Sequence, residues 1–186
     1  MRVVVGLTGS SGAIYGVKFL ERCPGDKFLV VSKWGGKVLE HELAMSLDDL
    51  RPHVKAVFRD DDLAAPFSSG SNRYDALVLM PCSISTLGKI ASGIADTLIT
   101  RAAQVALKER MPLIVGVRET PLSSIALENA LKLSREGAVI MPISPPWYKN
   151  PESMDDIVNG FVDKVLPILG VKVEGGWRAS ELDRTD

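Results

Sequence analysis

The sequence predicts an α/β fold with a single doubly wound, mostly parallel sheet and helices on both faces. Short apolar runs, rich in β-branched residues, alternate along the chain with longer segments whose apolar residues recur at helical spacing. Apolar residues occupy 46% of the 186 positions, which is enough to build one sizeable core. Strands that alternate with helices favour a parallel sheet, and right-handed crossovers between the strands place helices on both sides.

The first half of the chain contains three predicted strands and two predicted helices. The strands are expected at 3–7, 28–31 and, more weakly, 54–58, and the helices at 13–22 and 33–45. The glycine pair at 35–36 disfavours the start of the second helix. An irregular loop is expected to follow the weak strand, and within it the acidic triplet 60–62 is predicted to be a solvated surface turn.

The second half continues the alternation. Strands are expected at 76–80, 113–117 and 138–141, and helices after the segment 81–86 to about 92, at 96–110, at 121–137 and from 153 onward. Thr120 followed by Pro121 predicts an N-cap and a first helical position, and Gly137 predicts the end of that helix. Ser153 with Asp156 predicts a capping box for the last helix. One face of that helix is expected to carry Met154, Ile157, Val158, Phe161 and Val165.

Composition and charge disfavour several classes of protein. The 22 lysines and arginines nearly balance the 23 aspartates and glutamates, so a nucleic-acid-binding surface is not expected. No apolar stretch approaches the roughly 18 residues of a membrane span, and no signal peptide is visible, so we expect a cytoplasmic protein without a membrane partner. The 2 cysteines and 2 histidines predict neither a disulfide framework nor a metal site. Cys82 could be a nucleophile beside a helix start, but a small buried residue is favoured.

The segments that follow the predicted strands gather hydroxyl groups, glycines and a few cations. Ligands of doubly wound sheets bind outside the carboxyl ends of the strands, and these groups suit a ligand that carries a phosphate. The loop at 8–12 has neither the Gly-x-Gly dinucleotide pattern nor the Lys-Ser/Thr ending of a triphosphate loop. A mononucleotide is therefore favoured, and FMN is the common case. Close packing of helix on strand is the alternative role for these glycines.

Five side chains are ambiguous from the sequence alone. Arg101 and Lys108 are about two turns apart and so share one helix face, which is either a solvated surface or an anion clamp. Tyr148 in a proline-rich loop and Lys164 on the last helix are equally open. Glu42 on the second helix is by default a surface acid.

Six short motifs, in order and at family spacing, resemble the UbiX family of flavin prenyltransferases, long described as aromatic-acid decarboxylases. The match runs from residue 2 to about 170, and the motifs are Gly-Leu-Thr-Gly-Ser-Ser-Gly-Ala-Ile-Tyr-Gly at 6–16, Ser-Gly-Ser at 69–71, Pro-Cys-Ser-Ile-Ser-Thr-Leu at 81–87, Thr-Arg-Ala-Ala-Gln-Val-Ala-Leu-Lys-Glu-Arg at 100–110, Arg-Glu-Thr-Pro-Leu at 118–122 and Trp-Tyr-Lys-Asn-Pro at 147–151. The resemblance implies a Rossmann-like sheet of the flavoprotein type.

The resemblance also implies an activity. Such an enzyme transfers a dimethylallyl group from dimethylallyl phosphate to N5 of reduced FMN and closes a ring at C6, without a metal. The product, prenylated FMN, would serve a separate decarboxylase of the UbiD type. The family further implies a homo-oligomer, for which a dodecamer is one candidate assembly. Two alternatives stay open: a flavin-dependent decarboxylase or oxidoreductase, and a non-catalytic flavin carrier.

Carried over by position, the resemblance assigns the candidate site residues. The flavin nucleotide would be held by Gly9, Ser10, Ser11, Ser32, Ser83, Ile84, Ser85, Thr86 and Arg118. The prenyl phosphate would be held by Arg101, Lys108, Tyr148 and Lys164, since cations and a phenol hydroxyl stabilise charge on a leaving phosphate. Protons would be handled by Ser11, Glu42 and Glu119.

Three positions depart from the usual pattern of the family. Ser10 replaces Ala, Gln104 replaces a commoner Asp, and Lys164 stands where many members have Arg. The lysine keeps the charge but loses bidentate phosphate geometry, which affects substrate affinity and not the reaction class. Residues 1–170 are expected to form the flavin-binding domain and 171–186 a C-terminal tail.

Overall fold

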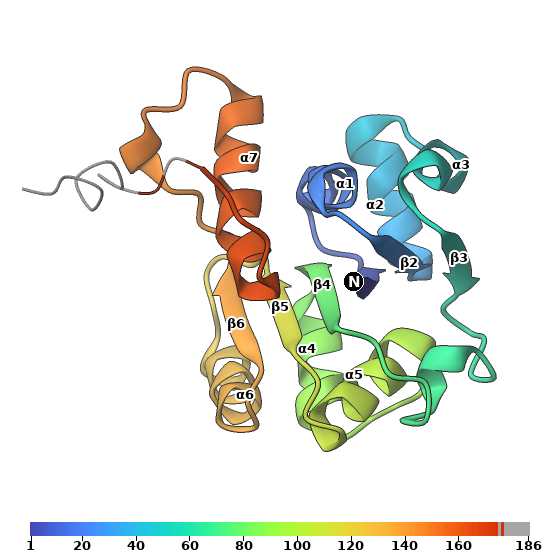
Figure 1. Ribbon diagram of the computed structural model, residues 1–186. Helices are drawn as coiled ribbons and strands as arrows, with labels where there is room; N and C mark the ends of the chain where they lie inside the picture. The colour runs from blue at the N-terminus through green and yellow to red at the C-terminus, as the bar shows by residue number, and fades with distance from the viewer. Residues whose placement is uncertain (175, 177–186) are drawn as a thin grey trace, which may run out of the picture.

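A six-stranded parallel sheet lies at the centre of the computed structural model, which describes residues 1–174 and 176 (Figure 1). The strands are β1 (Arg2–Leu7), β2 (Asp26–Val31), β3 (Ala56–Arg59), β4 (Ala76–Cys82), β5 (Leu113–Val117) and β6 (Val139–Pro142). Their order across the sheet is β3-β2-β1-β4-β5-β6. The direction of winding therefore reverses between β1 and β4, and this reversal marks the place where doubly wound sheets bind ligands.

The central strands are buried because they are apolar on both faces. Every residue of β4 and β5 is buried, and β1 is buried from Val3 to Leu7. A strand covered by helices on both sides needs such a continuous apolar run. The edge strands β3 and β6 contain only half-buried and exposed residues.

Helices cover both faces of the sheet, which confirms the predicted fold class. On one face lie α1 (Ala13–Arg22), α2 (Lys33–Leu43) and α7 (Met154–Val165), and on the other α4 (Ile84–Ala91), α5 (Leu98–Lys108) and α6 (Ser124–Arg135). Figure 1 shows these two groups on opposite sides of the strands. Short elements complete the chain: α3 (Leu47–Leu50), η1 (Arg51–His53), η2 (Pro66–Ser68), η3 (Trp147–Lys149) and η4 (Leu166–Leu169).

Hydroxyl side chains cap five of the helices. Each accepts a hydrogen bond from the backbone N–H three residues later, and the capping residues are Ser32, Ser83, Thr97, Ser123 and Ser153. The predicted capping box of α7 is confirmed, because Ser153 Oγ accepts from the N–H of Asp156 at 3.1 Å and Asp156 Oδ2 accepts from the N–H of Ser153 at 2.9 Å. These bonds satisfy N–H groups that a helix start leaves without intrahelical partners.

Four local expectations are wrong. The helix after β5 begins beyond Ser123, which caps it, and the Thr120–Pro121 peptide bond is cis in the preceding turn. Met154, in the first turn of α7, is 75% exposed, so the packed part of the predicted apolar face begins at Ile157. Asp60 is half-buried because it packs at the start of α5, whereas Asp61 and Asp62 of the same triplet are exposed, as predicted. The short helix α3 was not expected, since four residues cannot show a helical period.

The predicted tail is described only in part. Val171 and Val173 pack against the core on the side of the sheet that carries α7. Position 175 and positions 177–186 lie outside the described residues, so the predicted boundary at 170 stays a prediction. Among the residues that are described, no helix has the length and apolar character needed to span a membrane.

Candidate functional site

Three loops are joined by hydrogen bonds where the winding of the sheet reverses. Thr8, directly after β1, is buried, and its hydroxyl donates to the carbonyl oxygen of Pro81 (3.0 Å) and accepts from the N–H of Ser83 (2.7 Å). The Ser10 hydroxyl donates to the carbonyl oxygen of Arg118 (2.6 Å). The loops that follow β1, β4 and β5 therefore form one rigid rim. Sequence reasoning gave Thr8 no role, although its place directly after a strand was an available signal.

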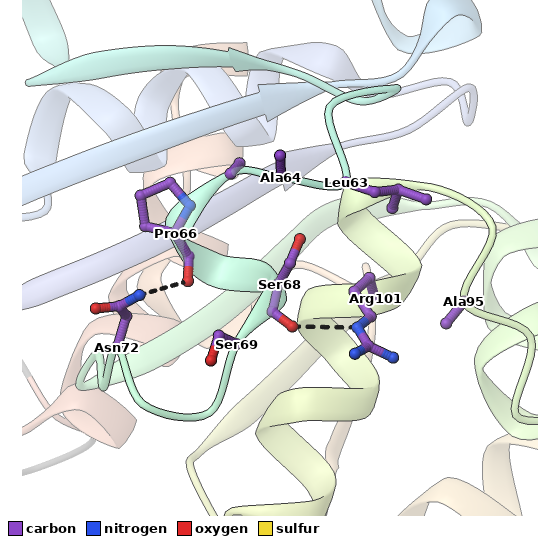
Figure 2. Close-up of a pocket in the computed structure, with 9 residues that line it drawn as sticks. Leu63, Ala64, Pro66, Ser68, Ser69, Asn72, Ala95 and Arg101 are labelled. Atoms are coloured by element: carbon purple, nitrogen blue, oxygen red, sulfur yellow. Dashed lines mark hydrogen bonds between the residues drawn. The ribbon is translucent and has the colours of Figure 1, made fainter.

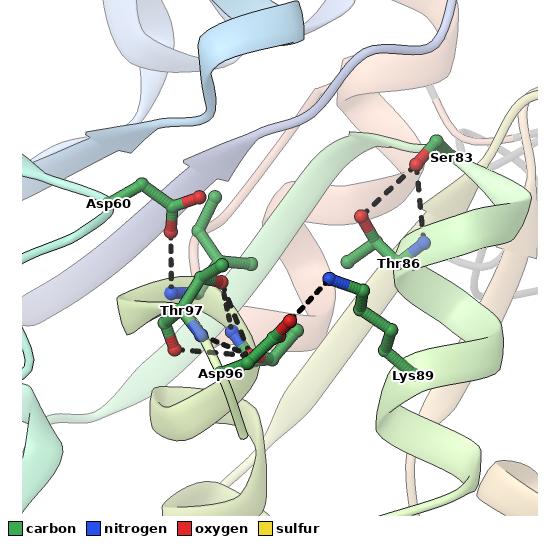
Figure 3. Close-up of polar contacts among 8 residues, drawn as sticks. Asp60, Ser83, Thr86, Lys89, Asp96 and Thr97 are labelled. Carbon is green, nitrogen blue, oxygen red and sulfur yellow. Dashed lines mark hydrogen bonds and ion pairs between the residues drawn. The ribbon is translucent and has the colours of Figure 1, made fainter. Parts of the chain in front are cut away.

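A pocket of about 310 Å³ opens beside this rim, at the N-terminus of α4. Five predicted flavin-binding residues line it: Gly9, Ser32, Ser83, Ser85 and Thr86. Ser83 Oγ accepts from the N–H of Thr86 (3.3 Å) and lies 3.0 Å from Thr86 Oγ1 (Figure 3). Ile84, in contrast, packs against the core. Hydroxyls and free amides at a helix N-terminus favour an anion, so this α4 pocket suits a phosphate.

Sequence reasoning missed more than half of the residues that line the α4 pocket: Lys33, Trp34, Asp60, Lys89, Thr97, Ile99 and Thr100. Lys89 Nζ pairs with Asp96 Oδ2 at 2.6 Å, and Figure 3 shows this pair at the pocket. Asp60 accepts from the N–H of Ile99 at 2.9 Å. Burial raises the pKa of Asp60 despite that bond. The position of Asp60 directly after β3 was the signal in the sequence that could have indicated Asp60 as a site residue.

The side chain of Glu42, a residue of α2, lies at the N-terminus of α1. Its carboxylate accepts from the N–H groups of Gly12 and Ala13, each at 2.9 Å, and from the Ser11 hydroxyl. Burial opposes ionisation, but the bond from Ser11, the two backbone bonds and the charge of Arg118 outweigh it, so the pKa of Glu42 lies below its usual value. The structure thus brings Ser11 and Glu42 together as a hydroxyl–carboxylate pair. Because Glu42 accepts from these loop amides, they are not open to a phosphate, and the α4 pocket lies at a different helix terminus.

The loop after β5 adds a cation and a second carboxylate to the rim. The charge of Arg118 acts on Glu42 and on Tyr15. Burial raises the pKa of Tyr15, and Arg118 offsets part of that rise. Glu119 is exposed, and its Oε1 accepts from the N–H of Thr120 at 3.0 Å within its own turn. The structure therefore places Glu119 on the rim but does not bond it to the Ser11–Glu42 pair.

Two predicted phosphate-binding cations lie in separate grooves along α5. Arg101 Nε donates to the carbonyl oxygen of Ser68 at 3.1 Å and faces a groove of about 480 Å³ (Figure 2). Lys108, two turns later, pairs with Glu109 at 2.9 Å in a groove of about 420 Å³. Each cation is accessible to an anion at the surface, but the two do not share one pocket within this chain.

Tyr148 and Lys164 form a pair on the other face of the sheet. Lys164 Nζ lies 4.9 Å from the centre of the Tyr148 ring, and both line a pocket of about 280 Å³ beside α7. The chain brings these two predicted residues together, but it does not bring them to Arg101 or Lys108, because α7 and α5 cover opposite faces.

Cys82, the cysteine that precedes the α4 pocket, is not accessible as a nucleophile. Burial raises the pKa of the Cys82 thiol to about 12, so it is protonated near neutral pH and is a buried core residue. In residues 1–174 and 176 no group of three His, Cys, Asp or Glu side chains could hold a metal ion.

Comparison with known proteins identifies the family. Residues 1–166 match the family model for flavoproteins. The chain is 48% identical to the flavin prenyltransferase UbiX of Thermoplasma acidophilum over 172 residues, which are 92% of this chain and 96% of that protein. It is 41% identical to the flavin prenyltransferase UbiX of Methanocaldococcus jannaschii over 173 residues, which are 92% and 94% of the two chains.

Solved structures agree with this relationship. The crystal structure of AnUbiX (PadA1) with FMN and dimethylallyl pyrophosphate superposes with a TM-score of 0.90 at 39% identity, covering 95% of this chain and 98% of that one. A dodecameric FMN-dependent UbiX-like decarboxylase from Escherichia coli O157:H7 superposes with a TM-score of 0.91 at 41% identity, covering 95% and 99%. The chain therefore belongs to the flavoprotein family and, within it, to the UbiX flavin prenyltransferases.

Proposed function

We propose that this chain transfers a dimethylallyl group from dimethylallyl phosphate to N5 of reduced FMN, with release of phosphate, and closes a ring at C6 to make prenylated FMN. The observation that supports the proposal is the loop after β1, in which Gly9 lines the α4 pocket and the Ser11 hydroxyl, two residues later, bonds to the Glu42 carboxylate. The similarity to a structure that holds FMN with dimethylallyl pyrophosphate supports the same pair of ligands.

The α4 pocket has the donors that an FMN phosphate needs. The hydroxyls of Ser85 and Thr86 and the first amides of α4 can donate, Lys33 supplies positive charge, and Lys89, which pairs with Asp96, lines the same pocket. When bound, the reduced flavin supplies two nucleophilic atoms, N5 and C6. Gly9 lets the first loop approach α2, because a Cβ at that position would lie 2.5 Å from the Cβ of Trp34.

The Ser11–Glu42 pair is suited to moving a proton. A carboxylate held ionised at neutral pH can accept a proton, and the Ser11 hydroxyl bonded to it can relay one from the ring position that closes. Glu119 is the second proposed acid, on the neighbouring loop with Arg118. We expect the two glutamates to serve different steps.

The anion-binding residues are proposed to act across subunits. Arg101 and Lys108 lie on one face of the chain and the Tyr148–Lys164 pair on the other, so a complete prenyl-phosphate site needs more than one copy. Exposed apolar residues on α6 support such contacts, with Ile125, Leu127 and Leu131 exposed by 71%, 53% and 51%. A related decarboxylase is described as dodecameric, and we propose a homo-oligomer of this kind.

The product would be consumed by a decarboxylase of the UbiD type, since prenylated FMN is a cofactor for another enzyme's chemistry. The expected cytoplasmic location stays a prediction.

Anaerobic incubation with reduced FMN and dimethylallyl phosphate tests the activity. We expect a flavin product heavier by one dimethylallyl-derived unit, detected by mass spectrometry, and free phosphate. Parallel reactions with the diphosphate donor show which donor is used. An unchanged flavin mass with both donors would contradict the proposal and favour the flavin carrier or redox alternative.

A further inference from the structure

One carboxylate on α7, Asp163, joins three segments of the chain. Its Oδ1 lies 2.6 Å from Arg22 Nη2 on α1, and its Oδ2 lies 2.6 Å from Lys149 Nζ in η3. Only 15% of the Asp163 side chain is exposed. Both oxygens are therefore engaged in short ion pairs that the solvent screens less than it screens an open surface pair.

The bond from Lys149 to Asp163 lies next to the Tyr148–Lys164 pair in the sequence and in space. Lys149 directly follows Tyr148, and Asp163 directly precedes Lys164. All four side chains line the same pocket of about 280 Å³. Within it, Lys149 is held by Asp163, whereas Lys164 is held over the Tyr148 ring at 4.9 Å.

The bond between Lys149 and Asp163 holds the η3 turn against α7. The chain that follows η3 enters α7 after Ser153. At 1.5 Å per residue, Ser153 and Asp163 are about 15 Å apart along the helix axis. The same loop also lies close to the helix at Pro146, since a Cβ on Gly160 would be in ordinary van der Waals contact with its ring, at 3.5 Å. The Lys149–Asp163 ion pair is thus a polar contact that ties η3 to the C-terminal half of α7.

We propose that Asp163 is a positioning residue for the prenyl donor: by holding Lys149 it fixes η3 on α7 and keeps Tyr148 and Lys164 at one separation. This inference rests on the proposed function, in which that pair binds the donor phosphate. A pair that is already ordered binds an anion without the entropic cost of ordering a loop. Asp163 does not itself touch the donor, and its effect is expected on donor binding and not on the chemical step.

The first test is Asp163→Asn, which keeps the shape and removes the charge. We expect the KM for dimethylallyl phosphate to rise about tenfold while kcat at saturating donor and the Kd for FMN change less than about twofold. Asp155→Asn is the matched control, because Asp155 also pairs α7 with α1, through Lys18 at 3.0 Å, and does not contact η3. Its KM is expected to equal that of the wild type.

A second pair of variants separates positioning from general stabilisation of α7. Lys149→Met breaks only the bond to η3 and is expected to raise the donor KM as much as Asp163→Asn does. Arg22→Met removes the bonds from α1 to Asp163 and to Asn159 on α7, leaves the Lys149–Asp163 bond in place, and is expected to lower the melting temperature with little change in KM. Asp163→Glu keeps the charge and is expected to restore most of the donor affinity. If Asp163→Asn does not fold, Lys149→Met, whose side chain is 26% exposed, makes the same test.

The outcomes are distinguishable. An unchanged donor KM in both Asp163→Asn and Lys149→Met, with an active wild type, overturns the positioning role alone. An equal rise of KM in Arg22→Met and Lys149→Met also overturns it, since the effect would then come from the docking of α7. A wild type that makes no prenylated flavin overturns the proposed function, and the positioning role with it.

Discussion

Replacing Glu42 with Gln removes the charge at the start of α1 while keeping the size of the side chain. The carboxylate now accepts from the N–H groups of Gly12 and Ala13 and from the Ser11 hydroxyl. The Gln side chain has only one oxygen that can accept these hydrogen bonds, and its NH₂ group would face one of the three donors. Hydrogen bonds to buried charges contribute roughly 1.5–3 kcal/mol, but residue 42 is exposed, so we expect the free energy of unfolding to fall by only about 1 kcal/mol.

The loss should depend on pH in one direction. Because folding lowers the pKa of Glu42, its contribution is present above its ordinary pKa of about 4.3 and disappears as the pH falls through the folded value. Urea unfolding of wild type and Glu42→Gln should therefore give a constant difference from about pH 6 to 8 and a smaller difference below about pH 4. A difference that does not change with pH would refute the assignment of an ionised Glu42.

The same variant tests the proton-handling role. Loss of a general base lowers kcat by about a hundredfold, whereas FMN affinity, which depends on the α4 pocket, should be unchanged. Glu40→Gln, at an exposed site on the same helix, is the matched control and should behave as the wild type. Glu119→Gln is expected to arrest a different step, seen as a different accumulated flavin species. Normal product formation by both Glu42→Gln and Glu119→Gln would refute the reasoning.

Three further predictions concern the fold and the pocket. Gly16→Ala should lower the free energy of unfolding by about 3 kcal/mol, because the new Cβ would meet a main-chain carbonyl of β4. Gly36→Ala, in α2 with open space around it, should raise the free energy of unfolding by about 1 kcal/mol. Urea unfolding measures both changes. Burial raises the pKa of Cys23 to about 11 and that of Cys82 to about 12, so iodoacetamide at pH 8 should modify neither until the chain unfolds, and modification of the folded protein would contradict their burial. Lys89→Met should weaken FMN binding about tenfold without changing the melting temperature of the ligand-free chain, and an unchanged Kd would remove Lys89 from the phosphate site.

The sheet was predictable because its signals are local. The run from Val3 to Leu7 is apolar throughout, as a strand covered on both faces must be, and the box of Ser153 and Asp156 marks the start of α7 within four residues. Local signals failed where two of them compete. Thr120-Pro121 and Ser123 both resemble a helix start, and only the structure shows that Ser123 caps α6.

The candidate site was only partly predictable because its contacts are long-range. The sequence motifs indicated the hydroxyls of the α4 pocket, but the burial of Asp60 depends on its bond to Ile99, 39 residues later. The capture of the Gly12 amide by Glu42 spans 30 residues, and no spacing rule predicts either contact. The roles of the predicted phosphate-binding residues stay predictions, since one chain does not bring them together.

A single-turnover experiment tests prenyl transfer most directly. Enzyme in excess over reduced FMN is mixed anaerobically with dimethylallyl phosphate, and phosphate release and flavin mass are followed in the same samples. The proposed reaction predicts that phosphate appears no later than the heavier flavin and that one phosphate is released for each flavin converted. Phosphate release without a change in flavin mass, or neither change, would contradict the transfer of a dimethylallyl group to FMN by this chain.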